Sequence, residues 1–141
     1  FTSEPTATFG DITFMGWHFI GDNNFEACET ITIQTAWTAK IAQAQTIHLS
    51  FALVDNPITR AIVNTDAPIS PIPVQFWDVD KPYYDERLLT IPCDLPSGAY
   101  SLTLTLYGIT DTGDILPNLP LSDTTLPAEG HLLVIGSVEV K

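Results

Sequence analysis

The chain has 141 residues, of which 45% are hydrophobic and only 16% are charged, a composition typical of one globular domain rather than a disordered linker. It carries 5 Lys and Arg residues against 17 Asp and Glu residues, and the formal net charge is −12. The basic residues are scattered, which excludes nucleic acid as a partner and disfavours anionic membrane surfaces. No apolar run is long enough to insert this domain into a membrane.

The sequence starts at Phe1 and shows no leader-like segment, so we expect a mature or excised piece of a longer protein. Residues 1–8 are polar and contain a proline, which predicts a linker or a frayed start. Residues 9–141 then form a single domain.

Alternation of apolar and polar residues at period two predicts antiparallel strands along most of this domain. In chain order, strands are predicted at 11–19 with a bulge at Gly16, at 29–37, at 46–53, at 59–64 as a short edge strand, at 85–91, at 99–106 and at 132–140. The residues predicted to face the core are Ile31, Ile33, Thr35, Trp37, Ile47, Leu49, Phe51, Leu53, Tyr100, Leu102, Leu104, Leu106, Leu132, Val134, Val138 and Val140. The weaker strand 85–91 carries the apolar residues Leu88, Leu89 and Ile91 without a clear alternation. Residues 116–130 hold three prolines and predict a long loop before the last strand.

Short strands with frequent turns, and no convincing helix, predict an all-β fold: an immunoglobulin-like antiparallel β-sandwich of about seven to nine strands. Tyr100 follows the turn Asp94-Leu95-Pro96-Ser97-Gly98 at the head of a core strand. This arrangement predicts a tyrosine corner, in which the Tyr100 hydroxyl bonds backbone near Asp94.

The chain's two cysteines, Cys28 and Cys93, precede two predicted core strands. The connections that lead into these strands lie at the same end of such a sandwich, so a disulfide is expected in an oxidising compartment. Two unpaired turn thiols are the alternative.

Three segments resemble a β-sandwich accessory domain of bacterial membrane glycosyltransferases, chiefly those similar to the dolichyl-phosphate-mannose–protein mannosyltransferases. They are Phe9-Gly10-Asp11-Ile12 through Gly16-Trp17 to Glu29–Trp37, then Trp77 with Asp85 and Leu89–Pro92, and then Asp94–Leu102 continuing through Leu106-Tyr107 to Gly136–Val140. The resemblance implies a C-terminal accessory domain outside the membrane, without catalytic residues of its own. It also implies extracytoplasmic display as part of a membrane-attached parent.

No arrangement typical of catalysis or zinc binding is present, and we expect no enzyme activity, cofactor or metal. Ser97 lies in a turn, and His48 lies in the outward phase of its strand. The histidines His18, His48 and His131 and the two cysteines lack the spacing of zinc ligands. Asp78 with Asp80, and Asp111 with Asp114, offer carboxylates near turns, but solvated turns are a better interpretation than calcium loops.

The sequence leaves two functions open. The first is a non-catalytic accessory or interaction domain, with another protein domain or a glycan as its partner. The alternative is a carbohydrate-binding module that uses exposed aromatic rings at Trp77, Tyr83 and Tyr84, close to one another in the sequence. Burial of these rings at the end of the core would argue against that alternative.

Overall fold

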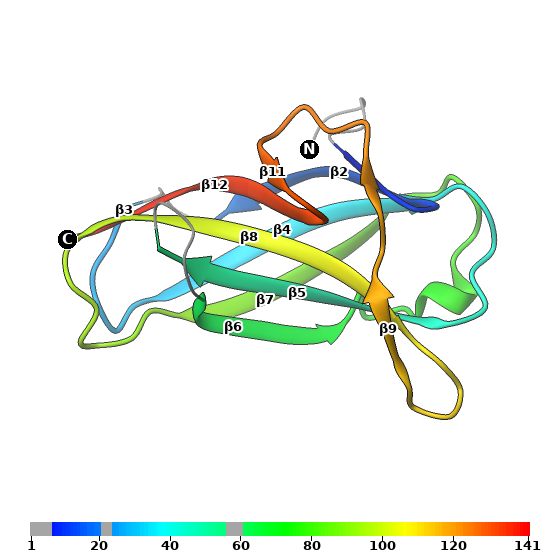
Figure 1. The fold of residues 1–141 in the computed structure, drawn as a ribbon, viewed down its shortest axis with the longest axis horizontal. Coiled ribbons are helices and arrows are strands. Elements are labelled where there is room, and N and C mark those ends of the chain that lie inside the picture. Colours follow the sequence, from blue (N-terminus) through cyan, green and yellow to red (C-terminus); the bar gives the residue numbers. More distant parts are fainter. Residues whose placement is uncertain (1–6, 21–23, 56–60) are drawn as a thin grey trace.

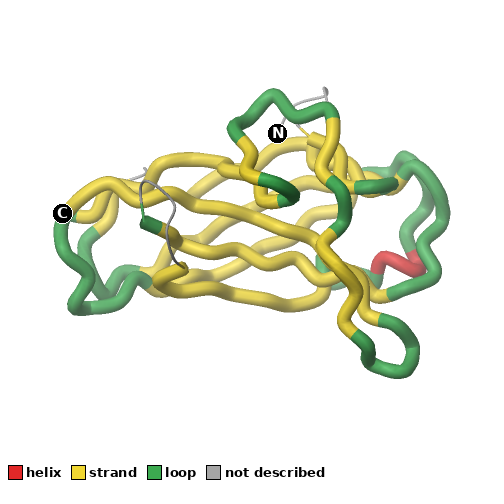
Figure 2. The backbone as a smooth tube through the Cα atoms, viewed as in Figure 1, coloured by secondary structure: helices red, strands yellow, loops and turns green. Residues whose placement is uncertain are grey.

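The structure, a computed structural model, describes residues 7–20, 24–55 and 61–141. These residues form two β-sheets packed face to face, with one short 3-10 turn, η1 (Val74–Phe76), and no α-helix in the described part of the chain (Figures 1 and 2). The strands are β1 (Ala7–Phe9), β2 (Ile12–Phe19), β3 (Asn24–Phe25), β4 (Thr30–Ala39), β5 (Thr46–Val54), β6 (Ala61–Pro68), β7 (Tyr83–Thr90), β8 (Gly98–Ile109), β9 (Ile115–Asn118), β10 (Leu121–Ser122), β11 (Ala128–Glu129) and β12 (Leu132–Val140). The predicted all-β sandwich is confirmed.

The sheet that lies farther back in Figure 1 has the strand order β10-β1-β2-β4-β7. The sheet in front has the order β11-β12-β8-β5-β6, with β3 added to β12 and β9 added to β8. All pairings are antiparallel except the two-residue pairing of β3 with β12. In this order β7 and β6 are the last strands of their sheets.

The core lies between the sheets and follows the predicted inward phase of β4, β5 and β8. Trp37 is fully buried, and its ring centroid lies 4.8 Å from that of Phe14 and 6.1 Å from that of Phe9. Its indole N–H donates to the Thr35 hydroxyl over 2.7 Å, so the one polar group of this core tryptophan is satisfied on its own strand. This bond explains a fully buried threonine in an otherwise apolar face.

Two segments predicted to lack regular structure contain strands. Ala7 and Thr8, expected in a linker, lie buried in β1, which pairs with both β2 and β10; residues 1–6 lie outside the described residues. The predicted loop 116–130 contains β10, β11 and most of β9. Local alternation is too short in two- and four-residue strands to be visible, and long-range pairing defines them.

The last strand changes phase at a bulge. Leu132 and Val134 were predicted to face the core, but Leu133 and Ile135 are buried instead. The register of β12 against β8 shifts between Val134 and Gly136, which inserts one residue and returns Val138 and Val140 to the inside. The bulge predicted at Gly16 in β2 is confirmed by a shift between Phe14 and Gly16.

Strand β7 directs charged as well as apolar residues toward the core. Its inward residues are Tyr83, Asp85, Arg87 and Leu89, whereas Leu88 is 61% exposed. The sequence holds adjacent leucines, and only one of them can point to the core in an extended strand. The structure therefore places two charged residues between the sheets and a leucine in solvent.

Candidate functional site

The predicted aromatic cluster is divided between the interior and the surface. Trp77 and Tyr83 are only 5% and 6% exposed, whereas Tyr84 is 56% exposed. Consecutive residues of a strand point to opposite faces, so the Tyr83 ring lies at the core while the Tyr84 ring is exposed to solvent. The burial of Trp77 and Tyr83 argues against the prediction that all three rings contact a sugar, and of the three only Tyr84 presents an exposed ring.

Trp77 and Tyr83 hold the connection between β6 and β7 against the end of the core. Their rings stack with centroids 4.6 Å apart and an interplanar angle of 5°. The Trp77 indole N–H donates to the Ile72 carbonyl over 2.8 Å, and the Tyr83 hydroxyl accepts the Asp78 amide N–H over 2.7 Å. These buried contacts give both rings a packing role.

Tyr84 stands between two adjoining pockets at the outer edge of β7. One pocket, of about 360 Å³, is lined by Gln34, Pro71, Tyr84, Asp85 and Glu86. The other, of about 280 Å³, shares Pro71 and Tyr84 and extends along Ser70, Ile72, Lys81, Pro82 and Tyr83. We call the two together the β7 groove. It combines one exposed ring with several polar side chains, a combination suited to a small polar ligand.

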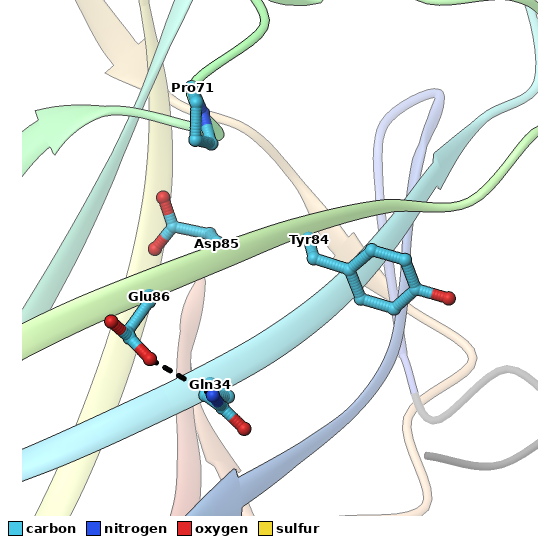
Figure 3. A pocket seen from close by; sticks show the side chains of 5 residues that line it. All are labelled: Gln34, Pro71, Tyr84, Asp85 and Glu86. Atoms are coloured by element: carbon cyan, nitrogen blue, oxygen red, sulfur yellow. Dashed lines mark hydrogen bonds between the residues drawn. The ribbon is translucent and has the colours of Figure 1, made fainter.

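Gln34 and Glu86 form the outer polar side of the first pocket (Figure 3). They are direct neighbours across β4 and β7, and the Gln34 amide N–H donates to Glu86 Oε1 over 2.9 Å. The pairing orients both side chains beside Tyr84 and leaves further acceptor capacity on the carboxylate.

Asp85 lies on the inner side of the same pocket, between β7 and Pro71 (Figure 3). Its Oδ1 accepts the Ser70 amide N–H over 2.9 Å and faces an Arg87 guanidinium nitrogen at 3.4 Å. Its Oδ2 is buried and has no hydrogen-bond partner among the described residues. Asp85 thus fixes the wall that carries Pro71 and retains one unused buried acceptor.

Arg87 connects β7 to the opposite sheet. One guanidinium nitrogen donates to the Leu49 carbonyl of β5 over 2.8 Å, and the other lies 3.4 Å from the Ala67 carbonyl of β6. The guanidinium also lies over the Phe51 ring, 5.9 Å from its centroid. These bonds fasten the open side of the sandwich just below the groove.

Sequence reasoning found Tyr84 but missed Gln34, Pro71, Asp85 and Glu86. The alternation through β7 and the pairing of β4 with β7 bring Gln34, Asp85 and Glu86 together, and the hydrogen bond from the Ser70 amide N–H to Asp85 holds Pro71 beside them. The alternation was available in the sequence, although the Leu88-Leu89 pair left its phase ambiguous.

The two predicted structural features at the other end of the sandwich are present. Cys28 and Cys93 form a disulfide with their Cα atoms 4.3 Å apart, as predicted. The Tyr100 hydroxyl donates to the Pro96 carbonyl over 2.6 Å. The acceptor lies two residues after Asp94, within the expected turn.

The acidic turns do not converge on a site. Among the described residues no group of three or more His, Cys, Asp and Glu side chains could hold a metal ion. Asp114 accepts the Thr112 hydroxyl over 2.9 Å, and Asp80 has a φ of 63° in a turn whose amide N–H bonds the Ala39 carbonyl. The Asp114 carboxylate therefore stabilises its own turn, and the backbone of Asp80 joins its turn to the end of β4.

A second polar cluster, missed by sequence reasoning, spans β8, β5 and β6. Asp66 accepts the Tyr107 hydroxyl over 2.5 Å and faces His48 Nδ1 at 2.9 Å, and the His48 and Tyr107 ring centroids are 5.3 Å apart. Burial, then the hydrogen bond to Asp66 and its charge, raise the pKa of Tyr107 to about 12. His48 lies on the outer face of its sheet, in the predicted phase.

No protein-family model matches this chain, and no curated protein shows significant sequence similarity to it. The fold does have a solved counterpart. The crystal structure of the C-terminal domain of Wzt superposes with a TM-score of 0.67 at 10% sequence identity, over 100% of this chain and 80% of that one. At that identity the likeness shows the fold alone.

A Niemann-Pick type C2 protein from the Japanese carpenter ant covers 100% of this chain and 98% of its own length, at 9% identity. Its TM-score of 0.42 is too low to carry an argument. Separately, the described residues contain no helix with the length and apolar character needed to cross a membrane.

Proposed function

We propose that this chain is a non-catalytic accessory domain of a larger, membrane-attached bacterial protein and is displayed outside the cytoplasm. The resemblance to accessory domains of bacterial membrane glycosyltransferases supports the parent and its placement. The Cys28–Cys93 disulfide supports an oxidising compartment, because structural disulfides persist there and are rare in the cytosol.

Thiol trapping in the native host tests this placement. Cells that express the full-length parent are quenched in acid, and their proteins are alkylated under denaturing conditions without reductant. The masses of the peptides that contain Cys28 and Cys93 are then measured by mass spectrometry. Extracytoplasmic display predicts no alkylated cysteine before reduction and two after it. Alkylation of both before reduction would contradict the placement.

A glycan is the ligand that the β7 groove supports best. The observation that carries this proposal is Tyr84, a 56% exposed ring beside the hydrogen-bonded Gln34–Glu86 pair in a pocket of about 360 Å³. An exposed ring can stack on the C–H face of a sugar while the neighbouring amide and carboxylate bond its hydroxyls. The site proposed is thus narrower than the three-ring cluster predicted from the sequence.

A glycan array followed by calorimetry on the soluble domain tests the groove. Tyr84→Ala should weaken binding of any glycan found by about tenfold or more, a loss of about 1.4 kcal/mol. The matched control is Leu88→Ala, which removes another exposed apolar side chain from the same face of β7 but outside the groove. Equal binding by Tyr84→Ala and the unchanged protein would refute the glycan site.

A further inference from the structure

We infer that the groove selects a glycan that carries no negative charge where it lies beside Glu86 and that donates hydroxyl or ammonium hydrogen bonds there. This inference rests on the proposed glycan function and adds the chemical class of the ligand. It stands on the acceptors that line the first pocket and on one buried carboxylate oxygen.

The five residues that line the first pocket offer acceptors and no cation. Gln34, Asp85 and Glu86 supply an amide and two carboxylates, and Pro71 and Tyr84 complete the lining. The Arg87 guanidinium is buried and occupied by the Leu49 carbonyl and Asp85. A ligand in this pocket therefore meets groups that accept hydrogen bonds and repel anions.

Asp85 gives an independent reason for a donor ligand. It is only 5% exposed, lines the pocket, and holds Oδ2 without a hydrogen-bond partner among the described residues. A buried acceptor without a donor costs free energy, and a ligand hydroxyl that reaches it recovers that cost. A carboxylate or phosphate on the ligand would instead place a second hydrogen-bond acceptor next to Asp85 Oδ2.

The two pockets of the groove differ in charge. Lys81 lines the second pocket, beyond Tyr84, and lies 5.8 Å from the Tyr83 ring centroid. We therefore expect the groove to discriminate against anions only in the first pocket, which Glu86 lines. The overall charge of −12 also repels anionic ligands at long range.

The decisive experiment compares one neutral oligosaccharide with its derivative oxidised at C6, in which carboxylates replace the primary hydroxyls. The neutral oligosaccharide is the strongest uncharged ligand from the array, and calorimetry is done on the unchanged domain. The oxidised derivative should bind about tenfold or more weakly. Equal or tighter binding of the oxidised derivative, or an array with acidic glycans alone as ligands, would overturn the inference.

Glu86→Gln locates the discrimination, because it removes one charge while keeping an acceptor for Gln34. The ratio of the affinities for the neutral and the oxidised oligosaccharide should fall by about threefold or more in this variant. Glu129→Gln is the matched control, since it makes the same charge change on exposed β11 of the other sheet and should leave the difference unchanged. An unchanged difference in Glu86→Gln would also overturn the inference.

Asp85→Asn tests the buried acceptor, with a thermal melt to verify the fold. The folded variant should bind the neutral glycan less tightly, and unchanged affinity would contradict the role of Asp85. If the variant does not fold, the Glu86→Gln comparison decides the inference. Absence of glycan binding, or binding insensitive to Tyr84→Ala, refutes the proposed function, whereas binding at Tyr84 without charge discrimination refutes only this inference.

Discussion

Tyr83 and Tyr84 show how much one step along a strand decides for a side chain. Tyr83 stacks on Trp77 in the core, and its hydroxyl accepts a backbone N–H. Tyr84 projects from the opposite face beside Gln34 and Glu86. Two identical adjacent residues thus have a structural role and a proposed binding role, because strand alternation separates them.

Tyr100→Phe is expected to lower the free energy of unfolding by about 1 kcal/mol or more, since it leaves the Pro96 carbonyl without its donor. Chemical denaturation of the two proteins measures the difference. The ring remains in the core, so the change isolates the hydroxyl. Equal denaturation midpoints and slopes would contradict a stabilising role for this bond.

Tyr107 should ionise near pH 12 rather than near its ordinary pKa of about 10. Burial is the largest cause and the Asp66 hydrogen bond the next, so both favour the neutral phenol in the folded state. The stability contributed by this raised pKa is fully present below pH 10 and is lost as the pH rises from about 10 through about 12.

The phenolate absorbance of the protein minus that of Tyr107→Phe isolates this titration. Asp66→Asn should lower the pKa of Tyr107 but keep the part of the shift that burial causes. A Tyr107 pKa near 10 in the unchanged protein would contradict the stabilisation of the neutral phenol by burial and by Asp66.

At the scale of elements, bulges decide which apolar residues enter the core. In β12 the inserted residue of the bulge, Ile135, is buried together with Leu133 before it, and the shift returns Val138 and Val140 to the core after it. A strict period-two prediction cannot place such a shift, since every residue of Leu132–Ile135 is apolar and either phase fits.

The inward charges of β7 fit its position at the edge of a sheet. A strand with an open edge can pair with another chain, and charged residues directed inward are one device that prevents this. Asp85 and Arg87 occupy these positions, and Arg87 bonds backbone carbonyls of β5 and β6. They close the sandwich at the place where the groove opens.

Arg87→Ala is expected to destabilise the domain by about 3–5 kcal/mol, because it leaves Asp85 buried without its cation. The double change Asp85→Leu with Arg87→Met removes both charges and should cost less than the single change. Thermal and urea unfolding measure both. A single variant as stable as the unchanged protein would show that the pair does not hold the edge.

At the scale of the whole molecule, the disulfide lies at one end of the paired strands β4 and β7, and the groove extends from the middle of this pair to its other end. Cys28 precedes β4, and its amide N–H bonds the Ile91 carbonyl just after β7, whereas the Asp80 amide N–H meets the Ala39 carbonyl at the far end of β4. Figure 2 shows loops at both of these ends. The crosslink therefore stabilises the fold without constraining the groove directly.

Reduction of the disulfide, or the double change Cys28→Ala with Cys93→Ala, should destabilise the domain by about 4 kcal/mol in the chain-entropy model for a loop of 65 residues. Urea denaturation with and without reductant measures this difference, and glycan binding serves as the control. Binding by the folded double variant should be unchanged, and lost binding in a folded protein would contradict the separation of crosslink and groove.

The sequence by itself determined the all-β class, the core-facing residues of β4, β5 and β8 and the Gly16 bulge, whereas for the cysteines it left a disulfide and two unpaired thiols as alternatives. These features follow from local period-two alternation and from turn residues, which act over a few neighbours. The tertiary structure alone decided the short strands β1, β9, β10 and β11, the phase of β7 and β12, and the burial of Trp77 and Tyr83. It also brought Gln34, Pro71 and Glu86 together at Tyr84, since residues distant in sequence meet only when strand pairing and the packing of two sheets fix their register.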